Sequence, residues 1–262
     1  MPAFSQATVS NRLLKALAPE AFEWLRPEMT AIDLGLKYVV VEANEPTLQV
    51  CFIESGLASM VAVSSDDEAV EVGHVGREGL GGHHVLLMTE TTPNRTFMQV
   101  AGTGIAVPIE HFLSIVDDHK PTRDLLLRYV HSASLQLAHS ALANARYSMQ
   151  ERLARWLLMC HDRLEGDNLA LTHEFLGMML GVRRAGVTNE LHILEGVHAI
   201  KSTRGNVKIL DRQKLQDIAG GCYGLPEAEY ERLIGIPMSH MHRGSSHRIF
   251  KLKNINNGPA SS

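Results

Sequence analysis

Two adjacent arginines, Arg183 and Arg184, begin a stretch of the sequence in which apolar residues recur at helical spacing. Residues 172–180 show the same spacing, and Gly181 lies between the two segments. Because glycine adopts the left-handed backbone of a sharp turn, the pattern predicts a helix-turn-helix whose second helix covers residues 183–195. An arginine at the start of that helix can form two hydrogen bonds with the edge of a guanine base. The two arginines therefore suggest a contact with DNA, and the predicted helices would have to hold them toward it.

The two predicted helices each combine an apolar face with a polar one. The apolar positions, which are expected to pack inward, are Leu176, Met179 and Leu180 in the first helix and Val187, Leu191 and Leu194 in the second. The outward positions of the second helix are Arg184, Ala185, Thr188, Asn189 and His192. Asparagine can bond an adenine edge as arginine bonds guanine, whereas Arg183, one position earlier, is expected to meet a phosphate.

A basic β-hairpin is expected directly after these helices. Residues 198–203 and 207–210 are short alternating runs on either side of an Arg-Gly-Asn turn. Residues 183–214 contain 7 basic and 3 acidic side chains. This layout predicts a winged helix whose cations lie along a phosphate backbone, whereas the two helices alone would fit an ordinary helical hairpin. The cations of the hairpin are Lys201, Arg204 and Lys208.

The charge of the 262-residue chain is unevenly divided along its length. The formal net charge is −4, but residues 1–120 carry 7 Lys and Arg against 16 Asp and Glu, while residues 121–262 carry 18 against 13. An acidic front half and a basic back half favour two domains that face different partners, although chance unevenness between surfaces would give the same counts. The composition, 45% hydrophobic and 21% charged, is that of a globular protein.

The cysteines and the first residues bear on the cellular compartment. Cys51, Cys160 and Cys222 are too far apart for a disulfide framework or a metal-ligand spacing, which fits a reducing cytoplasm. The N-terminal residues lack a basic segment followed by an apolar run, so no signal peptide is expected. No stretch of about eighteen consecutive apolar residues occurs, so we expect a cytoplasmic protein without a membrane partner.

The pattern of secondary structure changes twice along the chain. Residues 7–26 predict one or two short helices, and from about residue 30 to residue 108 short β-branched runs alternate with Gly, Pro, Asn and Asp. Residues 122–160 contain no Pro or Gly and predict one long helix or two nearly continuous ones. The expected fold class is α+β, beginning with a jelly-roll-like β-roll. The expected domains are a sensing β-roll over 1–120, a long helix over 121–160, a winged helix over 161–235 and a disordered tail over 236–262.

One face of the predicted long helix has a heptad-like spacing that is typical of helix pairing. Small residues on this face would let a second helix approach closely, so we expect a homodimer. Packing of the same face on the chain's own β-domain is the alternative. The members of the face are Leu126, Val130, Ala133, Leu137, Ser140 and Asn144.

Residues 220–233 follow the expected hairpin domain and read as a turn and a short amphipathic helix. We expect this helix to pack on the winged helix. Cys222, at its start, has no base beside it in the sequence, so a buried, inert thiol is expected there.

These segments resemble the Crp/Fnr family of bacterial transcription regulators, and the resemblance covers nearly the whole chain. It is strongest across "QERLARWLLMCHDRL", "LALTHEFLGMMLGVRRAGVTNELHILE" and the hairpin, and weaker across "VGREGLGG" and "NRTFMQV". The resemblance implies an effector-binding β-roll, a dimerisation helix and a winged helix-turn-helix. It also implies a homodimer that reads a palindromic DNA site through the helix at 183–195, with RNA polymerase as a further partner.

The resemblance assigns the DNA contacts more closely. Arg184, Ala185 and Asn189 occupy the base-contacting positions of the family. Ala185 stands where a glutamate is common in relatives, so the preferred half-site is expected to differ at the base pair that the glutamate would read. The full set of expected DNA-binding residues is Arg183, Arg184, Ala185, Thr188, Asn189, Lys201, Arg204 and Lys208.

The effector site that the resemblance implies departs from the cyclic-nucleotide-binding pattern. Arg95 and Thr96 match the Arg-Ser/Thr pair that holds the cyclic phosphate. Gly82 or His83 stands where a glutamate should bind the ribose, and Leu137 stands where a polar residue should meet the base. A buried hydroxyl without a partner costs about 1–3 kcal/mol, so we expect no tight binding of cyclic AMP. Arg95 could instead form a surface ion pair. The candidate effector residues are Gly81, Gly82, His83, Arg95, Thr96 and Leu137.

Other sensor chemistries of the family find few suitable residues. An iron–sulfur cluster needs about four well-placed cysteines, so the three scattered ones of this chain predict none. Haem needs only axial ligands, for which His74, His83 and His84 are candidates by location, but surface histidines are the simpler interpretation and no haem is expected. The effector therefore stays unidentified. The tail holds three more histidines, which could bind a metal weakly if the tail were ordered: His240, His242 and His247.

No enzyme motif supports a catalytic function. The patterns GxxxxGK[ST], GxGxxG, GxSxG and HExxH are absent, and "GREGLGG" lies in a strand-rich region without the βαβ frame of a phosphate-binding loop. The rival interpretation is a ligand-sensing β-roll protein whose helical C-terminal domain binds a protein partner. A partner-binding face more often presents large apolar residues, which the outward positions of residues 183–192 lack.

Overall fold

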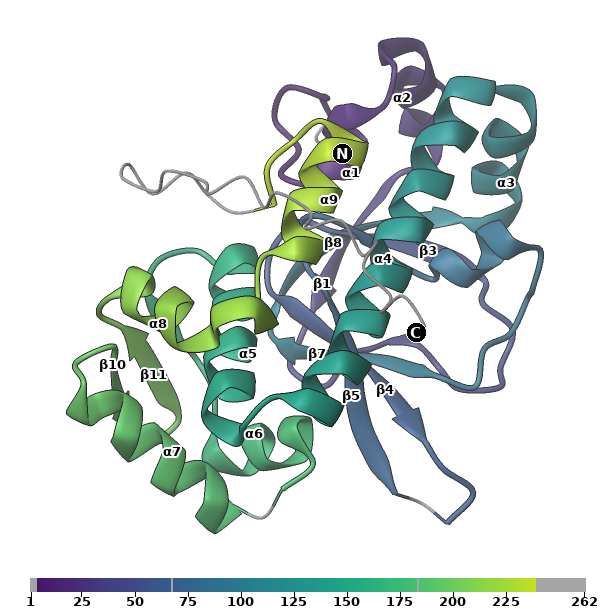
Figure 1. Cartoon of the computed structure of the whole chain (residues 1–262). Coiled ribbons are helices and arrows are strands. Elements are labelled where there is room, and N and C mark those ends of the chain that lie inside the picture. The colour runs from purple at the N-terminus through teal and green to yellow at the C-terminus, as the bar shows by residue number, and fades with distance from the viewer. Residues whose placement is uncertain (1–3, 67, 183, 239–262) are drawn as a thin grey trace, which may run out of the picture.

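The computed structural model describes residues 4–66, 68–182 and 184–238 of the chain. Its N-terminal domain contains two four-stranded antiparallel sheets, with strand orders β1-β8-β3-β6 and β2-β7-β4-β5. The strands are β1 (Thr30–Leu34), β2 (Val39–Val41), β3 (Gln49–Ile53), β4 (Leu57–Val63), β5 (Ala69–Val75), β6 (Leu80–Gly81), β7 (Arg95–Val100) and β8 (Gly102–Pro108). The expected β-roll is confirmed, and Figure 1 shows it beside the long helix α4 (Lys120–Arg146).

Strand β3 shows why the sheets and helices hold together. Alternate side chains of a strand point to opposite faces, and those of β3 enter two different apolar cores. Cys51 and Ile53 lie in the core between the two sheets, whereas Val50 and Phe52 lie in the core shared with the helices. The Phe52 ring meets the Phe112 ring edge to face, with 6.1 Å between the ring centroids. The helices that share this core include α1 (Arg12–Ala16), α2 (Pro19–Leu25), α3 (Ile109–Asp118) and α4.

A short break divides the long helical region into two helices. α4 contains 27 residues, and α5 (Met149–Arg163) begins almost at once after it. Ser148 and Glu151 form a capping box, in which the Glu151 carboxylate accepts a hydrogen bond from the Ser148 amide at 2.7 Å. Of the two alternatives for residues 122–160, the structure has two nearly continuous helices and not a single one. None of the helices in the described ranges combines the length and the apolar character that crossing a membrane requires.

The face of α4 that the sequence suggested for pairing is partly used within the chain. Leu126 and Val130 are buried in the N-terminal core, so the alternative of packing on the chain's own β-domain holds for them. The helical period fits two neighbouring faces equally well, and only the fold decides which one is covered. An exposed stripe on α4 repeats with the same 4-3-4 spacing and consists of Ser134, Ala138, Ala141 and Ala145.

The C-terminal domain contains α5, a helix pair, a small sheet and a further helix. Its sheet has the strand order β10-β11-β9. All six apolar positions predicted for the helix pair are at most 5% exposed, so the prediction of both apolar faces is confirmed. The elements are α6 (His173–Leu180), α7 (Arg184–Gly196), β9 (Asn168–Leu169), β10 (Ile200–Thr203), β11 (Asn206–Ile209) and α8 (Arg212–Ala219).

The last helix, α9 (Leu225–Ile234), corrects a prediction. The sequence predicts that the helix within residues 220–233 packs on the winged helix. In the structure, α9 instead packs along α4 and against the N-terminal domain (Figure 1). Tyr230 and Ile234, one helical turn apart, are buried in the N-terminal core. The Tyr230 hydroxyl finds a buried acceptor there, the carbonyl oxygen of Glu78, at 2.8 Å. The short-range pattern predicted the helix but contained no information about this distant partner.

Candidate DNA interface and sensor cavity

The turn between α6 and α7 has the geometry that the sequence predicted. Thr172 caps α6, because its hydroxyl oxygen accepts a hydrogen bond from the amide three residues later at 3.2 Å. Gly181 has a φ of 65°, a conformation that favours glycine. The Val182 amide donates to the Gly177 carbonyl at 2.9 Å, which ends α6 sharply. The two helices therefore meet at the tight turn of a helix-turn-helix.

Three of the predicted outward positions of α7 have described side chains, and Asn189 is the predicted base-contacting residue among them. Asn189 and His192 are exposed, and Thr188 is half-buried. Their orientation follows from the buried apolar residues on the opposite side of the helix, which fix its rotation. Arg183 lies outside the described residues. Arg184 and Ala185, the two other predicted base-contacting residues, belong to α7, but the structure does not describe their side chains.

The wing gathers positive charge on one face. In the antiparallel pair of β10 and β11, Lys201 lies directly opposite Lys208, and both are exposed. Like charges in opposite positions destabilise a strand pair, so an anion between them would be stabilising. Arg204 is also exposed, in the turn where Gly205 has a φ of 76°. The predicted hairpin is confirmed, and its arrangement of cations suits a phosphate backbone.

The wing is tied to α7 by hydrogen bonds. Glu195 of α7 accepts a bond from the Ser202 amide at 2.7 Å. The amides of Leu210 and Asp211 both donate to the Ala199 carbonyl at 3.0 Å. The first bond connects α7 directly to β10, and the other two join the residue before β10 to the residues after β11, so α7 and the wing form one continuous surface.

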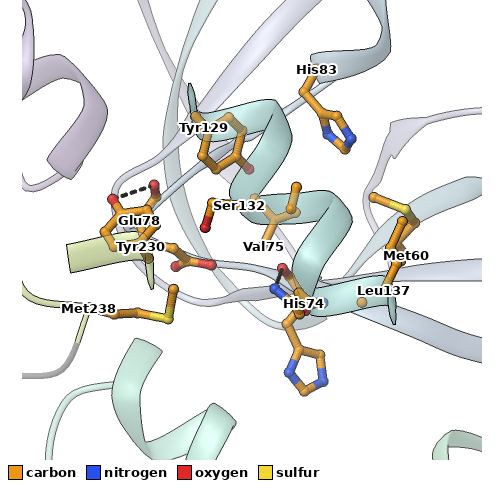
Figure 2. Close-up of a pocket in the computed structure, with 13 residues that line it drawn as sticks. Met60, His74, Val75, Glu78, His83, Tyr129, Ser132, Leu137, Tyr230 and Met238 are labelled. Carbon is orange, nitrogen blue, oxygen red and sulfur yellow. Dashed lines mark hydrogen bonds between the residues drawn. The ribbon is translucent and has the colours of Figure 1, made fainter. Parts of the chain in front are cut away.

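A narrow hollow lies between the β-roll and α4; the centre of a water molecule can move within only about 20 Å³ of it, which is room for about one water. Figure 2 shows that side chains from the β-roll, α4 and the C-terminal segment converge on it. None of the described residues that line it is a lysine or an arginine, so the hollow offers no cation to an anionic ligand. Its polar lining residues include Glu78, His83, Tyr129, Ser132, Gln136 and Tyr230.

A buried ion pair connects this hollow to α5. Arg163 Nε donates to Glu78 Oε1 at 2.7 Å, and the two side chains are 0% and 3% exposed. Burial by itself would lower the pKa of Arg163, but the charges of Glu78 and Asp162 outweigh it and raise the pKa above its ordinary value. The Arg163 guanidinium therefore stays charged inside the protein. This buried charge is stabilised by the carboxylate of Glu78.

The structure brings together only part of the predicted effector set. His83 and Leu137 both line the hollow. Arg95 is instead on the surface, where its Nε lies 3.0 Å from a Glu42 carboxylate oxygen. This is the ion pair that the alternative interpretation of Arg95 suggested. The predicted residues that are not among the described lining residues are Gly81, Gly82, Arg95 and Thr96.

The interpretation of the N-terminal histidines as surface residues is wrong. His74 is 3% exposed; its Nε2 lies 2.5 Å from a Glu71 carboxylate oxygen, and its ring meets the Trp156 ring edge to face. His83 and His84 are half-buried in a short 3-10 helix. His74 is covered because α4 and α5 pack over the end of β5, a long-range contact without a signature in the local sequence.

Metal-ligating and nucleophilic groups are sparse in the described part of the chain. Within residues 4–66, 68–182 and 184–238, no group of three or more His, Cys, Asp or Glu side chains is placed to hold a metal ion. The three tail histidines lie outside these residues. The cysteines are free and buried, and burial raises the pKa of the Cys222 thiol, as expected for an inert thiol.

The pKa of His83 predicts a pH-dependent stability. Burial, assisted by the neighbouring His84, lowers this pKa to about 4, whereas an unfolded histidine titrates near 6.5. As the pH falls from about 6.5 to 4, the unfolded chain binds one more proton than the folded chain, so stability is lost. The contribution of His83 to this loss is up to about 1.4 kcal/mol of unfolding free energy per pH unit. We expect His83→Gln to remove this contribution. Urea unfolding of both proteins at pH 7, 6 and 5 measures it, and identical pH profiles would contradict it.

Three residues of the buried centre were not predicted from the sequence: Glu78, Arg163 and Tyr230. Glu78 lies in the segment "GREGLGG", in which no local pattern indicates a buried carboxylate. Arg163 offered a signal, because it follows the continuously apolar segment 156–160 near the end of α5, where a charge is unexpected. Tyr230 offered none, because its partner lies 152 positions away.

Comparisons with known proteins agree with this geometry. Residues 151–218 match the Crp-like helix-turn-helix domain. FixK2 from Bradyrhizobium japonicum is 16% identical, with 74% of this chain and 98% of that chain covered and a TM-score of 0.65. A protein from Eubacterium rectale that is assigned to the crp/fnr family of transcriptional regulators is 15% identical, with 79% and 97% covered and a TM-score of 0.62. The c-di-GMP responsive global regulator CLP from Xanthomonas campestris is 16% identical, with 73% and 99% covered and a TM-score of 0.59. No curated protein sequence matches this chain.

The fold combines a β-roll, a long helix and a helix-turn-helix. Residues 151–218 are a Crp-like helix-turn-helix domain, and the chain shares its fold with solved structures of Crp/Fnr-type proteins. The resemblance inferred from the sequence is thereby confirmed.

Proposed function

We propose that this protein is a homodimer that binds a palindromic DNA site and reads its bases through α7. The observation that carries the proposal is the continuous surface of α7 and the wing. Asn189 on α7 is exposed and can bond an adenine edge. On the wing, three exposed cations suit the phosphates on either side of a groove: Lys201, Arg204 and Lys208.

The exposed stripe of α4 supports the homodimer. Its residues are Ser134, Ala138, Ala141 and Ala145, and their small side chains would allow two α4 helices to approach closely. Leu127 and Leu142, which are 42% and 43% exposed, add apolar surface on the same helix. Two copies joined in this way would place their recognition helices in successive major grooves, about 34 Å apart.

The hollow in the N-terminal domain supports a sensing role for a ligand other than a cyclic nucleotide. Its described lining contains the carboxylate of Glu78 and neither lysine nor arginine. A phosphate buried there would lose its hydration without gaining a cation, which is strongly unfavourable. The lining favours a small molecule without negative charge as the effector, and the hollow would have to widen to admit it.

Replacement of Arg184 by alanine tests the assignment of base contacts. Arg184 begins α7, the position from which this motif contacts bases. We expect Arg184→Ala to cost about 1–3 kcal/mol in binding to the preferred site and to relax the preference at one base pair of each half-site. Titration of cognate and scrambled duplexes measures both effects. Equal losses on the two duplexes would overturn the assignment of base contact.

Lys208→Ala is the matched control because this lysine is expected to contact a phosphate. It should weaken binding to cognate and scrambled DNA alike and reduce the slope of log K against log salt by about 1. A sequence-dependent effect of Lys208→Ala, or an unchanged salt slope, would remove the wing from the proposed phosphate contacts.

One observation favours the rival function, binding of a protein partner. Ile193, Val197 and Leu210 are apolar and between 42% and 50% exposed. They lie at and beyond the C-terminal half of α7, away from the positions assigned to bases, so both functions are compatible with the surface. Substitution of Val197 by serine should leave DNA binding unchanged if the assignment to bases is correct.

A further inference from the structure

Helix α9 is attached to both domains of the chain. Just before it, the Tyr223 hydroxyl donates to Asp162 Oδ2 at 2.6 Å, and Arg212, the first residue of α8, donates to Asp162 Oδ1 at 2.6 Å. Further along, Tyr230 and Ile234 are buried in the N-terminal core. The start of α9 is therefore fixed to the winged helix and its end to the β-roll. The match to the helix-turn-helix domain ends at residue 218, so α9 lies outside the matched residues.

The two attachments meet at neighbouring residues. Asp162 and Arg163 are the last side chains of α5; Asp162 holds α8, and Arg163 pairs with Glu78 of the β-roll. The carbonyl of the same Glu78 accepts the hydrogen bond of Tyr230. Displacement of α9 would therefore release Glu78 from Tyr230. Because Glu78 pairs with Arg163, the end of α5 would be released as well.

The turn that carries Glu78 has no room to adjust. A Cβ atom on Gly76 would lie 2.8 Å from the Arg163 Cβ, and one on Gly79 would collide with the Tyr129 hydroxyl. The backbone of the turn is therefore pressed directly against α5 on one side and α4 on the other. A shift of Glu78 must move these helices, because close-packed atoms transmit displacement.

The hollow lies at the same place. Tyr230 and Met238 contribute to its lining together with Glu78, Gln136 and Leu137, and Figure 2 shows the bond between Tyr230 and Glu78 at its edge. A molecule that entered the hollow would contact α9 as well as the β-roll and α4.

We propose that α9 is an intramolecular clamp that couples the hollow to the winged helix through Tyr230, Glu78 and Arg163. This inference rests on the proposed function and deepens it, because it names the element that connects sensing with DNA binding. The occupant of the hollow acts by loosening or tightening the contact of Tyr230 with Glu78, which changes how firmly the end of α5 holds α8.

Hydrogen exchange of the full-length protein without DNA or ligand tests the clamp. Tyr230→Phe removes one hydroxyl and keeps the ring. We expect amide exchange to accelerate about fivefold or more in α9, at the end of α5 (residues 159–163) and at the start of α8 (residues 212–216), with β3 and β8 unchanged. Tyr230→Leu should produce a larger acceleration in the same segments; if it fails to fold, Tyr230→Phe alone decides.

Arg232→Ala is the control on the exposed side of the same helix, and it should affect α9 alone. Acceleration confined to α9 in Tyr230→Phe would overturn the coupling, and uniform acceleration throughout the chain would show that Tyr230 is only a core residue. Because no DNA is present, these outcomes are independent of whether the proposed DNA function holds.

Discussion

Ala138→Arg is expected to convert the proposed dimer into a folded monomer that has lost most of its affinity for a palindromic site. Ala138 is exposed in the middle of the small-residue stripe on α4. Two arginines brought together at a close helix pair would bury like charges without partners, which strongly opposes association. The fold should survive, because arginine is a good helix former and exposed substitutions usually change stability by no more than about 0.5 kcal/mol.

The loss of affinity follows from bivalency. When one half-site is bound, the second recognition helix of a dimer binds from a high local concentration, which raises overall affinity by about 10²–10⁴-fold. Light scattering measures whether the protein is a dimer or a monomer. Titration of a palindromic duplex and of a single half-site measures how much affinity depends on binding both half-sites. Ser114→Arg, an exposed change on α3, is the matched control and should leave both unchanged. A dimeric Ala138→Arg protein would place the subunit contact elsewhere.

Glu78→Gln is expected to destabilise the protein by about 3–5 kcal/mol, because it leaves the buried charge of Arg163 without its partner. The substitution hardly changes the volume of the side chain, so the loss cannot come from a cavity. The midpoint of urea unfolding measures it.

Glu229→Gln provides a closely matched control. Arg232 and Glu229 also lie 2.7 Å apart, but their side chains are 64% and 31% exposed. Water solvates both groups when this pair is broken, so we expect almost no change in the unfolding midpoint. Equal effects of the two substitutions would show that burial does not set the strength of the Glu78–Arg163 interaction.

The helix-turn-helix was predictable because its signals are local. The apolar spacing, the Thr172 cap and the positive φ of Gly181 all depend on neighbours a few residues away. The wing was predictable for the same reason, since a two-residue turn and alternating strands leave a short sequence pattern.

The buried centre was not predictable, because its partners are far apart in the sequence. Glu78 and Arg163 are separated by 85 positions, and a single charged residue carries no information about which distant group will neutralise it. The same limit explains the placement of α9 and of Leu126. A helical period identifies an apolar face but does not say which surface will cover it.

The most direct test of the proposed function is selection from a pool of random-sequence duplexes by the full-length protein at physiological salt, followed by sequencing. The proposal predicts enrichment of a palindrome whose half-sites are one helical turn, about 10 base pairs, apart. Repeating the selection with Arg184→Ala should weaken the preference at one position of each half-site. If the pool shows no enrichment, in the presence or absence of small uncharged ligands, the surface of α7 and the wing does not read DNA sequence and the proposed function is contradicted.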